Sequence, residues 1–502
     1  MSLAAHLPVA PALLPLVAGI VLLGLRKRSL RVQRGVSLAA TLALVPLALT
    51  LVLAAAGGGQ QVYLLGDWVA PYGIVLVVDR LAAWMLLTTA LVALFALLYA
   101  LRGDDARGRH FHVLFQLQLF GLNGAFLTGD LFNLFVFFEI LLLASYGLLL
   151  HGGGRARVKA GLHFVVLNLI GSTLFLFAVG TLYGVAGTLN MADLAVKLAT
   201  TPAENAALVR SAGLLLFGVF ALKAALLPLY LWLPAAYAHT SAPVAALFAI
   251  MTKVGAYSIL RVDSLVFAGG AMAGLLDAWL APLALATLAL GMLGAVASTA
   301  LRQQVAYLVI VSVGTLLVAF GLDSGDALAA GLYYLPHSTF ATAALFLLAD
   351  RIAAARGARG DGFEPGPAMP RAALLGGLFF AAAVAIAGLP PLSGFLGKFM
   401  LLRAALASPL LPWVWTVVLV AGLIGVIALA RSGSLLFYRT QGQADATAAA
   451  PDYAALAPIA ALLLLGAAMT VWAGPLSDYA AATAAQLRDP GRYVDAVLGA
   501  GR

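Results

Sequence analysis

Long uninterrupted apolar runs constrain this chain more than any other feature. The 502-residue sequence repeats apolar stretches that match the about 20 residues an α-helix needs to cross the roughly 30 Å hydrocarbon layer of a bilayer. Outer-membrane barrels alternate apolar and polar residues along short strands instead. With 63% hydrophobic and 10% charged residues, a soluble fold would expose large apolar patches. The sequence therefore predicts an all-α, polytopic membrane protein.

The apolar runs predict about fourteen transmembrane helices. They lie near residues 7–25, 35–56, 74–101, 111–128, 130–150, 161–188, 209–236, 243–262, 275–300, 304–322, 327–350, 372–404, 411–437 and 454–474. Arginines and lysines concentrate in the loops after spans 1, 3, 5 and 11, all of them odd-numbered. The positive-inside rule then places both termini on the external side. We expect the first span to be a retained helix, because no small-residue cleavage site follows it.

Proline interrupts two of the spans. Span 7 contains the run 223–234, with Pro228 and Pro234, and span 12 contains 388–398, with Pro390 and Pro391. Proline removes a backbone donor, and a membrane tolerates the freed carbonyls only against protein or a watery cavity. The breaks are five spans apart, so the two broken helices run in opposite directions. This pattern predicts inverted five-helix repeats with broken helices 7 and 12.

The repeats divide the chain into four parts. We expect N-terminal helices 1–3 in residues 1–110 and a first five-helix repeat, helices 4–8, in residues 111–262. The second, inverted repeat, helices 9–13, is expected in residues 275–437. Residues 454–502 should hold helix 14 and a short external tail.

A few ionisable residues lie inside the apolar runs. Glu139 is the only one of three glutamates in a span, and three of six lysines, Lys223, Lys253 and Lys398, also lie in spans. A charge at the centre of a membrane helix costs about 2.5–3.5 kcal/mol on insertion scales, so it usually faces a partner or a water-filled cavity. His337 adds a group whose unperturbed pKa suits proton relay. These residues indicate a path for protons or cations, with Glu139 and Lys223 as a first pair.

Other interpretations of these residues remain open. The lysines could extend to the membrane interface, and Glu139 could serve as an interhelical staple. His163, near the start of span 6, is more typical of a structural residue, and His337 fits either role. Asp79 and Arg80 are adjacent and suit a structural or mouth-lining role.

Several functional classes lack the residues they need. The chain has no cysteine, which excludes iron–sulfur clusters, thiolate metal sites and disulfides from it. It contains no Walker A loop, no dinucleotide-binding glycine motif and no His-Glu-x-x-His. We therefore expect no cofactor, no metal and no nucleic-acid partner. The energy source must be an ion gradient or another subunit.

Four long motifs resemble one known family. The motifs are residues 128–139, ending in Glu139, residues 220–235 around Lys223, residues 239–244, beginning with His239, and residues 388–398, ending in Lys398. In this order they resemble the antiporter-like subunits of respiratory complex I and of Mrp cation/proton antiporters. The resemblance covers nearly the whole chain and is strongest to the D subunits of Mrp (also Mnh or Pha) antiporters.

The resemblance assigns roles to individual residues. It implies that Glu139 and Lys223 form the coupling pair and that Lys253, His337 and Lys398 lie on a central hydrophilic axis. His239, Thr342 and Asp79 are accessory candidates. The family often has a second lysine five residues after the histidine, where this chain has Thr342, so relay there would depend on water. The long lateral helix of the largest complex I homologue is expected to be absent.

The resemblance also implies a function. We expect a transporter subunit, not an enzyme, in a multisubunit antiporter of the bacterial inner membrane that exchanges external H⁺ for cytoplasmic Na⁺ or K⁺. Its partners would be the other subunits of the complex and membrane lipid. One alternative is a proton-pumping subunit of complex I (NADH:quinone oxidoreductase) or a related membrane hydrogenase. Another is a structural subunit that seals and scaffolds the complex while a partner moves the ions.

Overall fold

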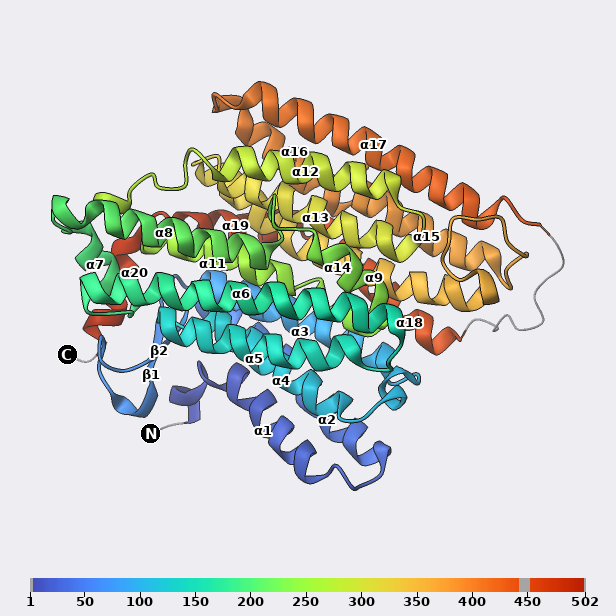
Figure 1. Ribbon diagram of the computed structural model, residues 1–502, viewed down its shortest axis with the longest axis horizontal. Helices are drawn as coiled ribbons and strands as arrows, with labels where there is room; N and C mark the ends of the chain where they lie inside the picture. Colours follow the sequence, from blue (N-terminus) through green and yellow to red (C-terminus); the bar gives the residue numbers. More distant parts are fainter. Residues whose placement is uncertain (1–2, 442–451, 501–502) are drawn as a thin grey trace.

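The fold is a bundle of roughly parallel helices with one small β-hairpin (Figure 1). The computed structural model describes residues 3–441 and 452–500. Within them the α-helices are α1 (Ala10–Gly24), α2 (Leu30–Ala56), α3 (Arg80–Ala100), α4 (Phe111–Leu127), α5 (Leu131–Leu150), α6 (Arg155–Ala186), α7 (Met191–Ala199), α8 (Ala203–Ala224), α9 (Trp232–His239), α10 (Ala242–Phe248), α11 (Met251–Leu265), α12 (Leu280–Ala297), α13 (Leu301–Phe320), α14 (Gly325–Ala355), α15 (Ala372–Ala387), α16 (Ser393–Ala404), α17 (Leu411–Phe437), α18 (Tyr453–Val471), α19 (Ala473–Leu487) and α20 (Pro490–Gly499). The strands are β1 (Gln61–Leu64) and β2 (Val75–Val78), and the 3₁₀ turns are η1 (Leu3–His6), η2 (Leu65–Asp67), η3 (Asp104–Arg107), η4 (Gly270–Met272), η5 (Gly357–Arg359) and η6 (Ala405–Ala407).

The helices confirm the predicted membrane fold. Eleven helical segments of the described chain are long and apolar enough to cross a bilayer, counting α10 and α11 as one. Three shorter apolar helices, α1, α4 and α15, occupy the positions of predicted spans 1, 4 and 12. Each of the fourteen predicted spans therefore has a helix, and spans 7, 8 and 12 are each made of two pieces, α8–α9, α10–α11 and α15–α16.

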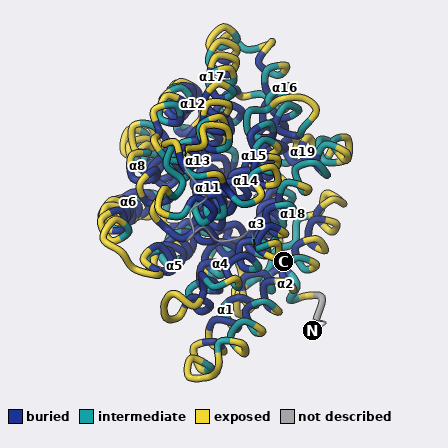
Figure 2. The backbone as a smooth tube through the Cα atoms, turned by 90° about the vertical axis from the view of Figure 1, so that its right-hand side faces the viewer, coloured by how far each residue is buried: buried dark blue, intermediate teal, exposed yellow. Residues whose placement is uncertain are grey.

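Burial follows position in the bundle. Figure 2 shows buried residues along the central helices and exposed residues on the outer ones. The α10–α11 window is fully buried, whereas only about a third of the apolar windows of α17 and α18 is buried. The exposed residues of α6 and α17 are mostly leucine, isoleucine, valine, tryptophan and phenylalanine. An outer surface of this kind suits contact with lipid or with apolar partner subunits.

Backbone contacts reveal the inverted repeat inside the chain. The turn 129–131, between α4 and α5, pairs with residues 189–191 through backbone hydrogen bonds of 2.9 and 2.8 Å. The turn 299–301, between α12 and α13, pairs with residues 361–363 through hydrogen bonds of the same two lengths. Each turn joins the first two helices of a repeat and meets the segment after the third. The first lies against β2 and the second at the opposite end of the bundle, as an inverted repeat requires.

Neighbouring groups hydrogen-bond to free backbone groups in the first break. Ala225 adopts a left-handed conformation after α8, and the Trp232 indole donates to the carbonyl of Leu222 at 3.1 Å. The next free amide, of Leu227, donates to the Thr287 hydroxyl at 2.9 Å. These contacts satisfy polar groups that could not remain unpaired in hydrocarbon. A broken helix is thus stable here because neighbouring helices supply its partners.

The structure corrects two sequence predictions. Span 3 was expected to begin near residue 74, but residues 75–78 form β2, and α3 begins at Arg80. A short apolar β-branched run such as Val75–Val78 does not distinguish strand from helix by periodicity. The expected short tail after helix 14 instead contains α19 and α20, both amphipathic helices that pack on the bundle. Their polar faces concealed them from a search for long apolar runs; Gly501 and Arg502 lie outside the described residues.

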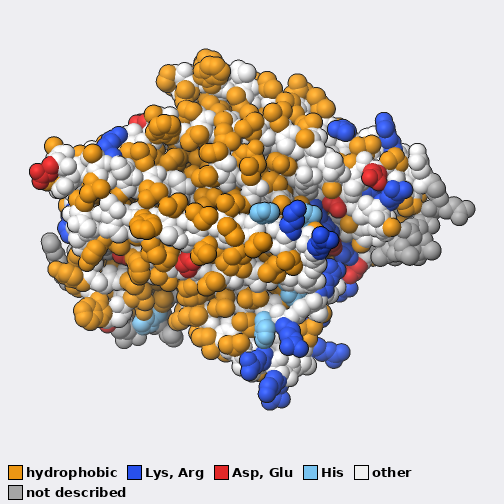
Figure 3. Space-filling model, in the orientation of Figure 1, with side chains coloured by type: hydrophobic (Ala, Val, Ile, Leu, Met, Phe, Trp, Pro, Cys, Tyr) orange, Lys and Arg blue, Asp and Glu red, His pale blue; other side chains and the backbone are white. Residues whose placement is uncertain are grey.

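The described ends of the chain meet at one end of the bundle. His6 Nδ1 lies 2.9 Å from the Tyr63 hydroxyl of β1, and α20 also contacts β1. An even number of crossings brings both ends to the same side, as the span count predicts. Figure 3 shows many of the visible lysine and arginine side chains at the opposite end and at the foot of the molecule.

Candidate functional site

Glu139 and Lys223 are connected through helix α6. Glu139 lies on α5 and is half-buried, and its Oε1 accepts a hydrogen bond from the Ser172 hydroxyl. Lys223, in the last turn of α8, donates from Nζ to Asn168 Oδ1 at 3.2 Å and to the Asn168 carbonyl at 3.4 Å. Asn168 and Ser172 are four residues apart, so they share one face of α6. The two predicted partners form no direct ion pair in the described structure, and α6 supplies the polar link.

The break after α8 holds Lys223 inside the protein. Its side chain is 5% exposed, and Nζ lies 5.8 Å from the centre of the Phe138 ring. A side chain at Gly255 of α11 would overlap the backbone of Ala224, so α11 and the end of α8 approach closely. This contact brings the helix of Lys253 directly against the helix of Lys223.

Lys253 is the most enclosed of the predicted residues. It lies in the first turn of α11 with no exposed surface, and its Nζ donates to Ser312 Oγ of α13 at 3.1 Å. The Ser312 hydroxyl donates in turn to the Val309 carbonyl at 2.7 Å. Lys253 cannot reach the membrane interface from this position. The alternative that its ammonium extends to the interface therefore does not apply to Lys253.

A small cavity continues the path beyond Ser312. It has a volume of about 20 Å³, measured as the space open to the centre of a water molecule. A space of this size is enough for one water. Its polar lining comes from α13, α14 and α16, namely Ser312, Tyr334, His337, Ser338, Thr342 and Lys398. The structure therefore brings three predicted residues, His337, Thr342 and Lys398, to one cavity and connects Lys253 to it through Ser312.

His337 is oriented by the second break. Its Nδ1 lies 2.8 Å from the Ser393 hydroxyl, at the start of α16, and that hydroxyl donates to the Gly466 carbonyl at 2.8 Å. These contacts orient the imidazole, and either ring nitrogen can hold the proton according to the tautomer.

Lys398 closes the second break. Its Nζ donates to the carbonyls of Ala387 at 2.8 Å and Ile386 at 3.4 Å, at the C-terminus of α15. An ammonium at a helix C-terminus is stabilised by the helix dipole. Gly388 has a φ of +76°, and a Cβ there would lie 2.8 Å from Lys398 Cδ. Glycine at 388 thus permits both the turn and the approach of the lysine.

Two accessory candidates lie away from this path. Asp79 caps α3 by accepting from the Ala82 amide at 2.8 Å, and it forms a buried ion pair with Arg261 of α11 at 2.6 Å. His239 ends α9 with an exposed side chain, and its backbone carbonyl is the group that makes a contact. His163 is exposed on the outer face of α6. The contacts of Asp79 are therefore those of a structural residue. In the described part of the chain, neither His239 nor His163 contacts the ionisable residues of the candidate site.

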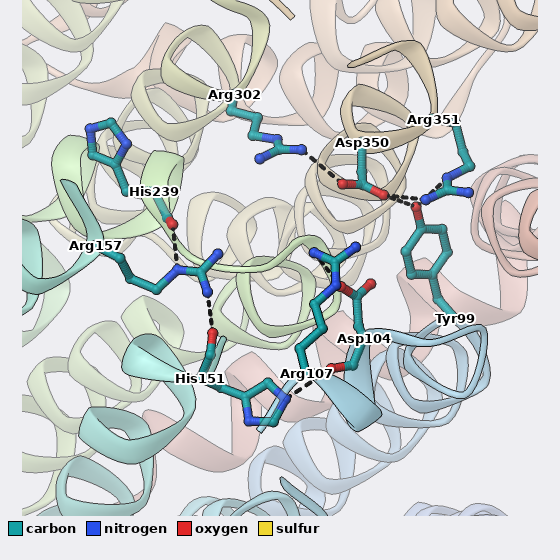
Figure 4. Close-up of polar contacts among 9 residues, drawn as sticks. All are labelled: Tyr99, Asp104, Arg107, His151, Arg157, His239, Arg302, Asp350 and Arg351. Atoms are coloured by element: carbon teal, nitrogen blue, oxygen red, sulfur yellow. Dashed lines mark hydrogen bonds and ion pairs between the residues drawn. The ribbon is translucent and has the colours of Figure 1, made fainter. Parts of the chain in front are cut away.

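Two groups of polar contacts lie at the basic end of the bundle (Figure 4). The Tyr99 hydroxyl of α3 donates to Asp350 of α14 at 2.6 Å, and Arg302 of α13 donates to the same carboxylate at 2.8 Å. Arg157 of α6 donates to the carbonyls of His151 and His239. The first group joins α3 to helices of the second repeat, and the second group holds helix ends within the first repeat. Sequence reasoning anticipated neither group.

The loop after α3 carries two carboxylates with different electrostatics. Burial raises the pKa of Asp104 above its usual value, with the nearby Asp350 adding to the effect and Arg107, 3.1 Å away, opposing it. Burial also acts to raise the pKa of Asp105, but hydrogen bonds from His112 and Arg34 outweigh it and lower that pKa to about 2. Asp105 is therefore a permanent charge that holds α2, the loop and α4 together.

The arrangement suits the movement of protons. Neutral lysine and histidine accept protons, hydroxyls both donate and accept, and a cavity water can bridge longer gaps. Sequence reasoning found the ionisable members but missed Asn168, Ser172, Ser312 and Ser393, which connect them. Each is a polar residue within a predicted span or break, and this polarity was the only sequence feature that could have indicated a role in the site. Their partners depend on which helices meet, and the sequence did not show that.

Comparison with known proteins gives consistent results. Residues 128–425 match the model of the family described as NADH:quinone oxidoreductase/Mrp antiporter, TM. The chain is 43% identical to the D subunit of the probable K(+)/H(+) antiporter of Rhizobium meliloti (strain 1021), over 99% of this chain and 98% of that protein. It is 37% identical to the D subunit of the Na(+)/H(+) antiporter of Bacillus subtilis (strain 168), over 98% and 99% of the two chains. A chain in the solved Mrp complex from Dietzia sp. DQ12-45-1b superposes with a TM-score of 0.89 at 30% identity, covering 99% of this chain and 100% of that one.

Proposed function

Because this chain belongs to the NADH:quinone oxidoreductase/Mrp antiporter family, we propose that it is a proton-translocating subunit of a multisubunit Na⁺ or K⁺/H⁺ antiporter. It is a transporter subunit and not an enzyme, as the names of its relatives indicate. The complex exchanges external protons for cytoplasmic sodium or potassium, and the proton gradient drives the exchange.

One observation carries this proposal. Ionisable residues that are costly in a membrane each have a polar side-chain partner. They form two groups, Glu139 and Lys223 on either side of α6 and Lys253 with the cavity of the second repeat, and the close contact of α8 with α11 brings the two groups together. Glu139 contacts Ser172, Lys223 contacts Asn168, and Lys253 contacts Ser312 at the edge of the cavity. A scaffold would be more stable with apolar residues of similar volume at these positions, because charge burial requires compensation. The ionisable residues at these positions are explained if they carry protons.

The contacts suggest how a proton moves through the second repeat. A protonated Lys253 can pass a proton to the Ser312 oxygen when the hydroxyl proton of Ser312 turns from the Val309 carbonyl to a water in the cavity that Ser312 lines. A cavity water can then take the proton to His337 or to Lys398 when either is neutral. Charge on Glu139 favours protonated Lys223, and loss of that charge favours its release. Coupling to the cation arises if the cation changes the charge near Glu139.

The finer assignments form part of the proposal. We place the chain in the bacterial cytoplasmic membrane with the basic loops inside and both termini outside, because basic residues concentrate at the end opposite the termini. We divide it into residues 1–110, 111–262, 275–437 and 454–502. Its partners are the other subunits of the antiporter, since a similar chain forms part of the Mrp complex. The complex I alternative is less favoured, because relatives that match nearly the whole chain, including the two described above, are antiporter subunits.

The test is antiport by Glu139→Ala in the assembled complex. The substitution should abolish cation-dependent proton movement in everted vesicles from antiporter-deficient cells, while the amount of assembled complex stays unchanged. Glu139→Asp should keep part of the activity, since the charge survives at shorter reach. Glu204→Ala is the matched control, because Glu204 is exposed at the start of α8. Normal exchange by Glu139→Ala would favour the scaffold alternative instead.

A further inference from the structure

A basic hollow lies between the first two loops at the charged end of the bundle. It has a volume of about 470 Å³ and sits between the α1–α2 connection and the loop that precedes α4. Its lining includes Arg26, Lys27, Gln33, Arg109 and His110. Figure 3 shows lysine and arginine side chains gathered at this foot of the molecule. The hollow is remote from the path of Lys223, Lys253 and Lys398 in the core.

The positive charge of this hollow has no internal counter-charge. Arg26, Lys27 and Arg109 form no ion pair within the described chain. The acids of the neighbouring loop are already engaged: Asp104 pairs with Arg107 at 3.1 Å, and Asp105 binds Arg34 at 2.6 Å and His112 at 3.1 Å. Three cations around one concave surface make a favourable place for an anion with several oxygen acceptors, such as a phosphate.

The surroundings of the hollow favour a lipid over a soluble anion. The connection joins the apolar helix α1 to α2, which is long and apolar enough to cross a membrane, so its basic residues lie where a span begins. On the α1 side, the exposed residues next to the hollow are Val21 and Leu23, and on the α2 side Val32 is exposed. A phospholipid fits both features, because its phosphate can meet the cationic hollow and its acyl chain can meet the apolar residues beside the hollow.

We propose that this hollow binds the phosphate-bearing headgroup of an anionic phospholipid, with an acyl chain along the outer face of α1. The guanidinium groups of Arg26 and Arg109 and the Lys27 ammonium contact the phosphate from the two loops. The lipid thereby joins the α1–α2 hairpin to the α3–α4 loop, which Asp105 already holds to Arg34 of α2. The site is independent of proton translocation and concerns how the N-terminal helices are held in the membrane.

The test uses the intact complex in nanodiscs of phosphatidylcholine that contain a phosphatidylglycerol probe with a photoactivatable acyl chain. Cross-linked peptides are identified by mass spectrometry, and the probe is titrated. Labelling of α1 and α2 should be saturable in the unmodified protein. A charge-assisted hydrogen bond to the phosphate contributes about tenfold or more to the affinity, so Lys27→Ala with Arg109→Ala should lower it about 100-fold. Arg109→Ala alone should lower it about tenfold, which keeps the test available if the double variant does not assemble.

A matched control separates a site from general surface charge. Arg28→Ala with Arg31→Ala removes the same charge from an exposed residue of the connection and an exposed residue of the first turn of α2, neither of which lines the hollow. Its apparent affinity should stay within about twofold of the unmodified protein, since general attraction is screened by salt. Equal losses in the two double variants would overturn the proposal.

Two further outcomes would also overturn it. Inorganic phosphate that displaces the probe at equal concentration would show a site for the free anion, since it lacks the acyl chain. Labelling of the isolated full-length chain that disappears in the complex would show that a partner subunit covers the hollow. Saturable labelling of the complex that resists inorganic phosphate supports the lipid.

Discussion

Ser312→Ala removes a single hydroxyl group, and we expect this small change to slow antiport strongly. The Ser312 hydroxyl is the described hydrogen-bond partner of the Lys253 ammonium, at 3.1 Å, and it also lines the cavity shared by His337 and Lys398. A hydrogen bond to a charged group contributes about 1.5–3 kcal/mol. If the proton passes through this hydroxyl, loss of that amount from the transfer step should slow exchange about 10- to 100-fold. Ser312→Thr keeps a hydroxyl and should retain most of the rate.

The assay is the recovery of a pH-dependent fluorescence signal when Na⁺ or K⁺ is added to everted vesicles. Ser258→Ala is the matched control, because Ser258 is buried on α11 and its hydroxyl bonds only within its own helix, to the Val254 carbonyl at 2.9 Å. The amount of assembled complex is measured for each variant, since a lost rate matters only at equal abundance. An unchanged rate in Ser312→Ala at equal abundance would refute the step through Ser312.

Two other substitutions test the structure beyond this step. Asp79→Asn leaves Arg261 buried without its charge partner, which typically destabilises a protein by about 3–5 kcal/mol; thermal unfolding of the purified complex should occur at a clearly lower temperature, and an unchanged transition would show that the pair is dispensable. Thr342→Lys places an ammonium at the cavity of His337 and Lys398, so the protein should assemble and the pH profile of exchange should shift. If position 342 instead meets hydrocarbon, the new charge costs about 3 kcal/mol and membrane abundance falls with no change in the profile.

The arrangement of spans was predictable because a bilayer imposes strong rules. Apolar length gave the fourteen spans, and the alternation of basic loops gave their direction. Prolines in two spans, at residues 228 and 390–391, located the breaks that the structure has at the end of α8 and of α15. The pairing of turns 129–131 and 299–301 with later segments then confirmed the inverted repeat.

The errors arose where the bilayer rules do not apply. The run Val75–Val78 is apolar enough to extend span 3, yet it pairs with residues 61–64 as a hairpin. Helices α19 and α20 are amphipathic, and only their contacts with the bundle determine their fold. In both cases tertiary contacts decided the structure, and a single sequence does not show them.

The site was predictable in its members and not in its connections. An ionisable residue in a span is unusual enough to notice, so Glu139, Lys223 and Lys253 could be selected from the sequence. Serine and asparagine are common in membrane helices, so Ser312 and Asn168 could not be distinguished from packing residues. The expected contact of Glu139 with Lys223 turned out to run through α6, because the direction of each side chain depends on helix rotation.

Lys253→Met gives the most direct test of the central claim that protons pass through this chain. Lys253 has no exposed surface and connects the first repeat to the cavity of the second, and methionine keeps its length without a site for a proton. Lys197→Met is the control, because Lys197 is exposed and pairs with Asp193 outside the core. We predict an assembled complex with no cation-dependent proton movement for Lys253→Met and normal exchange for Lys197→Met. Normal exchange by a fully assembled Lys253→Met complex would contradict the claim.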